Sequence, residues 1–72
     1  MPKKNIRYTD HAIKRKLERD IKDEEIDQTL ASPDYTISSI EERKIAVKQI
    51  GPKTLHVVYK EQKENIIIIT VY

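Results

Sequence analysis

The stretch IIIITVY, residues 66–72, decides which fold the rest of the sequence can adopt. It is apolar on both faces of an extended chain, and strands of this kind lie in the interior of a sheet. It is also far shorter than the roughly 20 apolar residues of a transmembrane helix. An interior strand needs a neighbour on each side. One is the preceding strand-like segment, and the other could be NIRY, residues 5–8.

The second half of the chain supplies the other strands of this sheet. Its segments alternate between two faces or are rich in β-branched residues, and turn-forming residues separate them. The predicted strands cover residues 35–40, 44–50, 54–60 and 66–72. The sequence therefore predicts an antiparallel sheet of four strands, to which residues 5–8 could add a short fifth strand.

The first half of the chain predicts two helices. Thr9 and Asp10 are good N-cap residues, and no Gly or Pro follows them closely. Ile13, Leu17 and Ile21 recur at every fourth position and form one apolar stripe. We expect this stripe to face the core.

The second helix follows almost at once. Asp20 is the expected end of the first helix, and Asp23 is the expected cap of the second. Ile26 and Leu30 supply its apolar pair. The helix stops before Pro33, because a proline disfavours a helical residue before it. The whole pattern predicts an α+β fold in which two N-terminal helices pack on the sheet.

Length and composition narrow the class of protein. The chain has 72 residues, of which 38% are hydrophobic, so it predicts one small domain spanning residues 1–72. It has no Cys and no apolar segment typical of a signal peptide, which favours the cytoplasm. The formal net charge of +2 permits nucleic-acid binding but does not require it, so the placement of the charges must decide.

Three basic side chains recur along one side of the first predicted helix. Each residue advances about 100° round an α-helix. His11, Arg15 and Arg19 therefore follow one side, with Glu18 beside them. The common meaning of such a pattern is a solvated face, in which Arg15 and Glu18 form an ordinary helix pair.

The same side chains also suit the chemistry of phosphate. An imidazole such as His11 can act as a general base near neutral pH. Arg15 and Arg19 can hold a phosphate through forked hydrogen bonds and offset charge in a transition state. Cleavage of RNA without a metal needs a base for the 2′-OH, cations for the phosphate and an acid for the leaving oxygen. We therefore take His11, Arg15 and Arg19 as candidate catalytic residues.

The residues of this helix and of the chain's later segments resemble the domain-of-unknown-function family numbered 4258. The family pattern is T-x-H-A-x-x-R-(apolar)-x-x-R-x-I near the start, then a helix ending before Pro-Asp, and a closing strand with T-x-Y. Lys16 departs from it where a Met-like residue is usual, and Asp20 departs where Gly is common. The matching residues are Thr9, His11, Ala12, Arg15, Arg19, Ile21, Pro33, Thr70 and Tyr72.

This resemblance implies a function by kinship of fold. The family is similar to the RelE-like and BrnT-like toxins of bacterial and archaeal toxin–antitoxin systems. Those toxins share a helix–helix–sheet fold, and many cleave RNA without a metal. A cognate antitoxin protein is then an expected partner. Fold alone does not fix function, so these are expectations from analogy.

Basic residues on the sheet are further candidates for RNA binding. His56 and Lys60 share one face of the strand at 54–60, and Lys44 and Lys48 share one face of the strand at 44–50. If these two faces coincide, they form a basic surface that could follow an RNA backbone. A solvated outer face is the plainer alternative.

The closing strand adds two candidates. Thr70 and Tyr72 lie on one face of it and could line a site. Tyr72 could stack on a base or act as an acid, although a tyrosine at this position more often serves packing. We take Tyr72 as a candidate catalytic residue, and Lys48, His56, Lys60 and Thr70 as candidate RNA-binding residues.

Other site chemistries find little support in the sequence. Two His residues far apart, without Cys, do not have metal-ligand spacing, and one Gly cannot make a glycine-rich phosphate loop. We therefore expect neither a metal nor a cofactor.

Three functions remain open. The first is a small metal-independent endoribonuclease toxin held inactive by an antitoxin. The alternative is a non-catalytic module of the same fold that binds RNA or a protein, which the modest net charge slightly favours. A third is an interaction protein whose exposed strand edge pairs with another chain.

Overall fold

The computed structural model describes residues 5–39 and 41–72. Residues 1–4 of the predicted domain, and Ile40 of the predicted strand 35–40, lie outside these described residues. The elements in chain order are β1 (Asn5–Tyr8), α1 (Asp10–Glu18), α2 (Asp23–Ala31), β2 (Tyr35–Ser38), β3 (Arg43–Ile50), β4 (Lys53–Glu61) and β5 (Asn65–Val71). The predicted α+β class is therefore confirmed.

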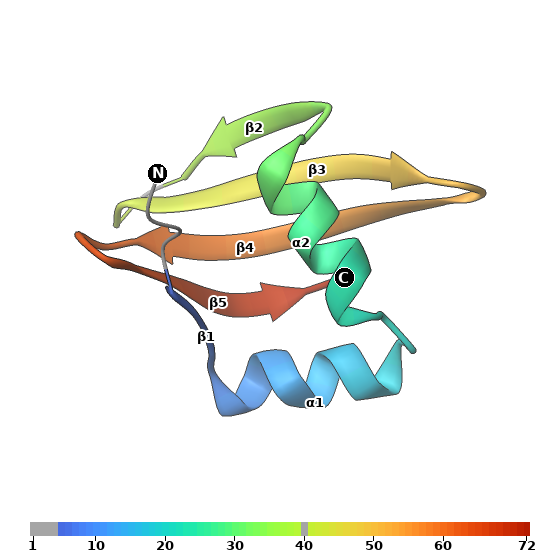
Figure 1. The fold of residues 1–72 in the computed structure, drawn as a ribbon, viewed down its shortest axis with the longest axis horizontal. Coiled ribbons are helices and arrows are strands. Elements are labelled where there is room, and N and C mark those ends of the chain that lie inside the picture. The colour runs from blue at the N-terminus through green and yellow to red at the C-terminus, as the bar shows by residue number, and fades with distance from the viewer. Residues whose placement is uncertain (1–4, 40) are drawn as a thin grey trace.

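The strands form one mixed sheet in the order β1-β5-β4-β3-β2 (Figure 1). β2, β3, β4 and β5 pair antiparallel with their neighbours, as predicted. β1 is the additional N-terminal strand and pairs in parallel with β5. β5 thus lies between β1 and β4, and the interior position expected from its apolar sequence is confirmed.

An irregularity in β5 determines which of its side chains reach the core. Val58 lies opposite Thr70, but the next residue of β4, Tyr59, lies opposite Ile68. Ile69 is therefore an extra residue in β5, a bulge that shifts the alternation of side chains by one position. As a result, Ile68 and Val71 lie on the same face of the sheet, and both are fully buried.

Both helices cover this one face of the sheet. α1 packs along β5, beyond the point where β1 ends, and α2 crosses β4 and β3 (Figure 1). The core between helices and sheet consists of Ala12, Ile21, Ile26, Leu55, Val57, Ile68 and Val71. No element of the described chain covers the opposite face, and we call it the open face.

The prediction that the apolar stripe faces the core is wrong for Ile13 and Leu17, although its third member, Ile21, is buried. Ile13 is 45% exposed and Leu17 is 73% exposed, whereas Ala12 is fully buried. A methyl side chain at Ala12 lets the helix backbone approach β5 closely. Arg15 and Lys16, one turn further on, are half-buried, because long side chains can cover apolar surface with their methylene stems. The side of α1 that carries Ala12, Arg15 and Lys16 therefore faces the protein, and Ile13 and Leu17 face outward.

α1 ends in a Schellman motif. Glu18 is the last helical residue, two positions before the predicted end. Asp20 has a left-handed φ of 53°, and its N–H donates to the carbonyl of Leu17 at 3.3 Å. The N–H of Ile21 donates to the carbonyl of Lys16 at 2.9 Å, and this turns the buried Ile21 into the core.

The start of α2 also differs from the prediction. Its N-cap is Lys22, and the predicted cap Asp23 is instead the first helical residue. A carboxylate oxygen of Glu25 accepts a hydrogen bond from the backbone N–H of Lys22 at 3.0 Å. Glu25 thus supplies an acceptor for a backbone donor at the start of the helix. Asp23 forms an ion pair with Lys16 of α1.

The length and hydropathy of the helices bear on whether any of them could cross a membrane. Over residues 5–39 and 41–72, no helix has both the length and the apolar character needed to cross a membrane.

Candidate anion-binding site

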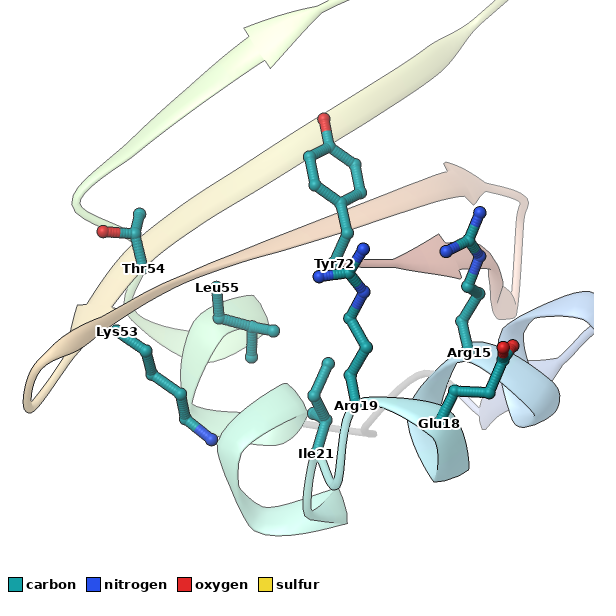
Figure 2. A pocket seen from close by; sticks show the side chains of 8 residues that line it. All are labelled: Arg15, Glu18, Arg19, Ile21, Lys53, Thr54, Leu55 and Tyr72. Carbon is teal, nitrogen blue, oxygen red and sulfur yellow. The ribbon is translucent and has the colours of Figure 1, made fainter.

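A pocket of about 500 Å³ opens between the end of α1 and the start of β4. Figure 2 shows its lining, which consists of Arg15, Glu18, Arg19, Ile21, Lys53, Thr54, Leu55 and Tyr72.

The pocket follows from an offset between two strands. The backbones of His56 and Tyr72 pair through two hydrogen bonds, at 2.7 and 2.9 Å. β4 begins three residues earlier, at Lys53, and so extends past this pair. α1 lies along β5 and reaches the same end of the sheet. Its last turn therefore faces the first residues of β4 across a hollow that no other described strand fills.

Two guanidinium groups project into this space. The side chains of Arg15 and Arg19 both extend from α1 toward the strands (Figure 2). Within residues 5–39 and 41–72, neither guanidinium group has a hydrogen bond or an ion pair. Glu18 is the one carboxylate in the lining, so the two arginines outweigh it in charge. Forked, uncommitted N–H donors at a concave site suit a phosphate or carboxylate ligand.

The third cation of the pocket is held differently. Lys53 Nζ lies 3.0 and 2.9 Å from the two carboxylate oxygens of Glu25, at the start of α2. The backbone N–H of Lys22 and then the Lys53 ammonium lower the pKa of Glu25, because both stabilise its charged form. This pair fixes Lys53 at the rim and leaves Arg15 and Arg19 as the free cations of the lining.

Tyr72 supplies the aromatic side of the pocket and rests on His56. The two rings are stacked, with centroids 4.6 Å apart and planes 5° apart. Tyr72 is 45% exposed. Nδ1 of His56 is buried without a hydrogen-bond partner among the described residues. Because His56 lies opposite Val47, on the face of the sheet without helices, the stacked pair presents a supported aromatic surface on that face, at the end of the sheet where the pocket lies.

The structure brings three of the four candidate catalytic residues together. Arg15, Arg19 and Tyr72 line one pocket. His11 does not line it: it lies exposed on α1, one turn before Arg15. Four residues of α-helix correspond to about 6 Å along the axis. His11 is thus a neighbour of the pocket rather than part of it.

The predicted basic surface on the sheet does not form. His56 lies opposite Val47, and Lys60 opposite Arg43, so both belong to the open face. Lys48 lies opposite Leu55, on the face that carries the helices, and its Nζ donates to the carbonyl of Ser32 at 2.8 Å. The condition for a basic surface, that these two faces coincide, is therefore not met.

Lys44 and Thr70 complete this correction. Lys44 lies opposite Tyr59 on the helix-bearing face and pairs with Glu61 at 3.2 Å. Thr70 lies opposite Val58, on the open face with His56 and Lys60. The open face is mostly apolar rather than basic, since Tyr35, Ile37, Ile45, Val47 and Val58 share it.

Sequence reasoning missed Lys53, Thr54 and Leu55 as pocket residues. They stand in and just after GPK, residues 51–53, one of the turn-forming stretches that separate the predicted strands, where exposed residues are ordinary. Their place in the pocket depends on how far β4 extends past β5, which a single sequence does not encode locally. Within the described residues, no group of three or more His, Asp or Glu side chains is placed to hold a metal ion.

The profile of one family, described as a domain of unknown function (DUF4258), matches residues 8–72. The chain belongs to the DUF4258 family. A search of curated proteins and a search of solved structures each returned no significant match.

The motif residues of this DUF4258 domain fall into two groups. Thr9 caps α1 by accepting the N–H of Ala12 at 3.1 Å, and its hydroxyl donates to the carbonyl of Ile69 at 2.9 Å. Ala12 and Ile21 are core residues. Asp34, after Pro33, accepts the backbone N–H of Gln49 at 2.9 Å. These positions have structural tasks.

The second group has no structural task of this kind. Within the described chain, the side chains of His11, Arg15 and Arg19 make no hydrogen bond or ion pair, and the core does not include them. This contrast within one motif is what marks the DUF4258 pocket as a candidate ligand site.

Proposed function

We propose that this DUF4258 domain binds single-stranded RNA at the pocket and is a small, metal-independent endoribonuclease, the toxin of a toxin–antitoxin pair with RelE-like kinship. One observation carries the proposal: Arg15 and Arg19 line a concave site together with Tyr72, and neither guanidinium group has a hydrogen bond or an ion pair among the described residues. A nucleotide of single-stranded RNA suits this site. Its phosphate can accept hydrogen bonds from the two guanidinium groups, and its base can stack on the ring of Tyr72.

The reaction assigns a role to each side chain. Arg15 and Arg19 hold the scissile phosphate and offset the charge that develops on it. His11 takes the proton of the 2′-OH, whose oxygen then attacks the phosphorus atom. The bond from phosphorus to the 5′ oxygen breaks, and Tyr72 donates a proton to that oxygen. The products are a 2′,3′-cyclic phosphate and a 5′-OH end.

A second function is favoured by the position of His11. Because this residue lies outside the pocket lining, the pocket could bind the RNA backbone without cutting it. The domain would then be a non-catalytic RNA-binding module of the same fold. Both functions need the arginines, but only the first needs His11.

A binding and cleavage assay in EDTA separates the two. Purified protein is mixed with end-labelled single-stranded RNA, and the bound and cleaved fractions are measured. We expect Arg15→Ala and Arg19→Ala each to weaken binding roughly 10-fold or more, as for the loss of a charge-assisted hydrogen bond. Each should also reduce the slope of log affinity against log salt by about 0.7, as for one single-strand phosphate contact.

The controls are built on the same helix. Lys14→Ala removes an exposed cation of α1 that does not line the pocket, and it should change binding little. His11→Ala should bind as well as the wild type but leave the RNA intact. Binding by the wild type without any product would establish the non-catalytic module. Absence of binding even at low salt would refute both functions.

The toxin assignment has its own test. Induced expression of the wild-type chain should arrest growth and degrade cellular RNA, while expression of His11→Ala should do neither. Equal growth of both cultures, with both proteins folded and abundant, would remove the toxin assignment and leave RNA binding to be judged by the assay above.

A further inference from the structure

One edge of the sheet is exposed along its whole length. β2, residues Tyr35–Ser38, pairs with β3 on one side, and all four of its residues are exposed. In Figure 1 β2 forms the upper edge, and no other drawn element lies along its outer side. Tyr35 and Ile37 are 55% and 46% exposed, which is unusual for large apolar side chains on an edge.

The pairing of β2 with β3 identifies the backbone groups that point outward. The N–H of Ser39 donates to the carbonyl of Arg43 at 2.8 Å, and Ile37 lies opposite Ile45 in the same register. Hydrogen-bonding residues alternate along an antiparallel strand. The N–H and C=O groups of Thr36 and Ser38 therefore point away from β3, toward the outer edge.

Apart from its short length of four residues, β2 lacks the usual devices against pairing. Natural edge strands carry charges, prolines or bulges that deter a second strand. Residues 35–39 contain no charge and no proline, in a chain of which 36% is charged. The opposite edge, β1, carries Arg7 and runs directly into α1. β2 is therefore the edge of the sheet with which a further strand can pair.

We propose that the partner is a second copy of this chain, whose β2 pairs antiparallel with the first about a twofold axis at Ile37. In this register Thr36 of one copy lies opposite Ser38 of the other. All outward backbone groups of Thr36 and Ser38 are then hydrogen-bonded, and the two sheets become one. The interface is isologous, as twofold dimers require.

The side chains are complementary in the same register. Ile37 meets Ile37 of the second copy on the open face, and each Tyr35 reaches the other copy's Ile37 diagonally. Thr36 and Ser38 meet on the opposite face. Aromatic and β-branched pairs and hydroxyl pairs stabilise neighbouring strands, and no like charges face each other. An uncharged edge is complementary to itself, and this favours a second copy over a charged partner.

The dimer would also extend the apolar open face. Ile45 and Val47 lie directly across β3 from Ile37 and Tyr35, so pairing joins two such strips across the axis. The pocket lies at the end of α1 and the start of β4, with β3 between it and β2. Dimerisation therefore leaves Arg15 and Arg19 open, and this inference does not depend on the proposed function.

The experiment is a measurement of mass in solution, by light scattering during size-exclusion chromatography or by sedimentation equilibrium. The wild type at high micromolar concentration should have the mass of a dimer. Ile37→Lys should be monomeric, because it places two ammonium groups together at the axis. Leu17→Lys makes the same kind of change at an exposed apolar residue of α1 and should remain dimeric. Circular dichroism verifies that both variants are folded.

Cross-linking tests the register of the two β2 strands without introducing a charge that disrupts their pairing. The chain has no Cys, so single Cys variants give unambiguous products. Ile37→Cys should form a disulfide-linked dimer under mild oxidation, because residues on the axis of a non-hydrogen-bonded pair are about 4.5 Å apart. Thr36→Cys should not, since it lies opposite Ser38. A monomeric wild type, or a link through Cys at 36 but not at 37, would overturn the proposal.

Discussion

The ring of Tyr72 lies flat on the imidazole of His56, with centroids 4.6 Å apart. Their backbones are also paired, through hydrogen bonds of 2.7 and 2.9 Å. One face of the tyrosine ring is therefore occupied, and its position is set by the strand beneath it. Under the proposed function, a base that stacks on Tyr72 would meet a ring that is already oriented, which lowers the entropy lost on binding.

The first prediction concerns this ring. Tyr72→Ala should lower the affinity for single-stranded RNA by about 10-fold, since base stacking on an aromatic side chain contributes about 1–3 kcal/mol. Fluorescence anisotropy with a labelled oligonucleotide measures it. Tyr72→Phe keeps the ring and should bind like the wild type, but under the proposed mechanism it should cleave more slowly. Equal affinity of the Ala variant would show that the ring does not contact a base.

The end of α1 gives a prediction on stability. Asp20 holds a φ of 53°, which costs a residue with a β-carbon more than it costs glycine. Asp20→Gly should therefore raise the free energy of unfolding, by up to about 1 kcal/mol, since left-handed backbone costs an L-residue roughly that amount. Urea denaturation measures the change. Asp20→Ala keeps the β-carbon and should not be stabilised, so a less stable Gly variant together with a more stable Ala variant would contradict this account of the turn.

The orientation of α1 can be tested by contrasting two apolar positions. Ala12 is fully buried against β5, so Ala12→Leu should overpack the contact and cost about 1–3 kcal/mol. Leu17 is 73% exposed, so Leu17→Ala should change the free energy of unfolding by less than about 0.5 kcal/mol. If Leu17 belonged to the core, its truncation would cost about 2–5 kcal/mol instead.

The Glu25 carboxylate predicts a dependence of stability on pH. Its pKa is lowered in the folded state, first by the Lys22 N–H and then by Lys53. The charged form is thus favoured by folding. This stabilisation is complete above the unfolded-state pKa, about 4.3 for Glu, and is lost as the pH falls through the lowered folded-state pKa. Thermal melts of the wild type should show this loss between pH 5 and the acid limit.

Glu25→Gln is the variant that isolates this effect. It should be less stable than the wild type at pH 7, and the difference should shrink as the pH falls through the same window. Glu24→Gln, at an exposed neighbouring position of α2, should leave the pH profile nearly unchanged. If the difference in stability between Glu25→Gln and the wild type were the same at all pH values, the charge of the Glu25 carboxylate would not contribute to the pH dependence of stability.

The sequence predicted the sheet well because each strand carries its own alternation, and the doubly apolar residues 66–72 could only be interior. It failed at α1 because an alanine, and not the larger Ile13 and Leu17, makes the closest contact with β5. Apolar periodicity weights side chains by size and hydropathy. It does not detect a position where a small residue is required for close approach.

The candidate site was predictable in part for a related reason. The spacing of Arg15 and Arg19 on one side of a helix is a local property, and both do line the pocket. The contribution of Lys53 depends on the offset of two strands. The separation of Lys48 from His56 depends on the register between β3 and β4. Alternation within a strand can be read from sequence, but the register between strands follows from turns and packing.

The parallel pairing of β1 with β5 also constrains how the domain is made. The hydroxyl of Thr9 bonds to the carbonyl of Ile69, 60 residues later, and the only sheet partner of β1 in the described chain is β5. During synthesis, β1 and α1 leave the ribosome long before the strand on which they dock. The hairpins of β2, β3 and β4 can form earlier through contacts between nearby residues. The docking of α1 on β5, and with it the arginine pocket, is therefore completed only after β5 has been translated.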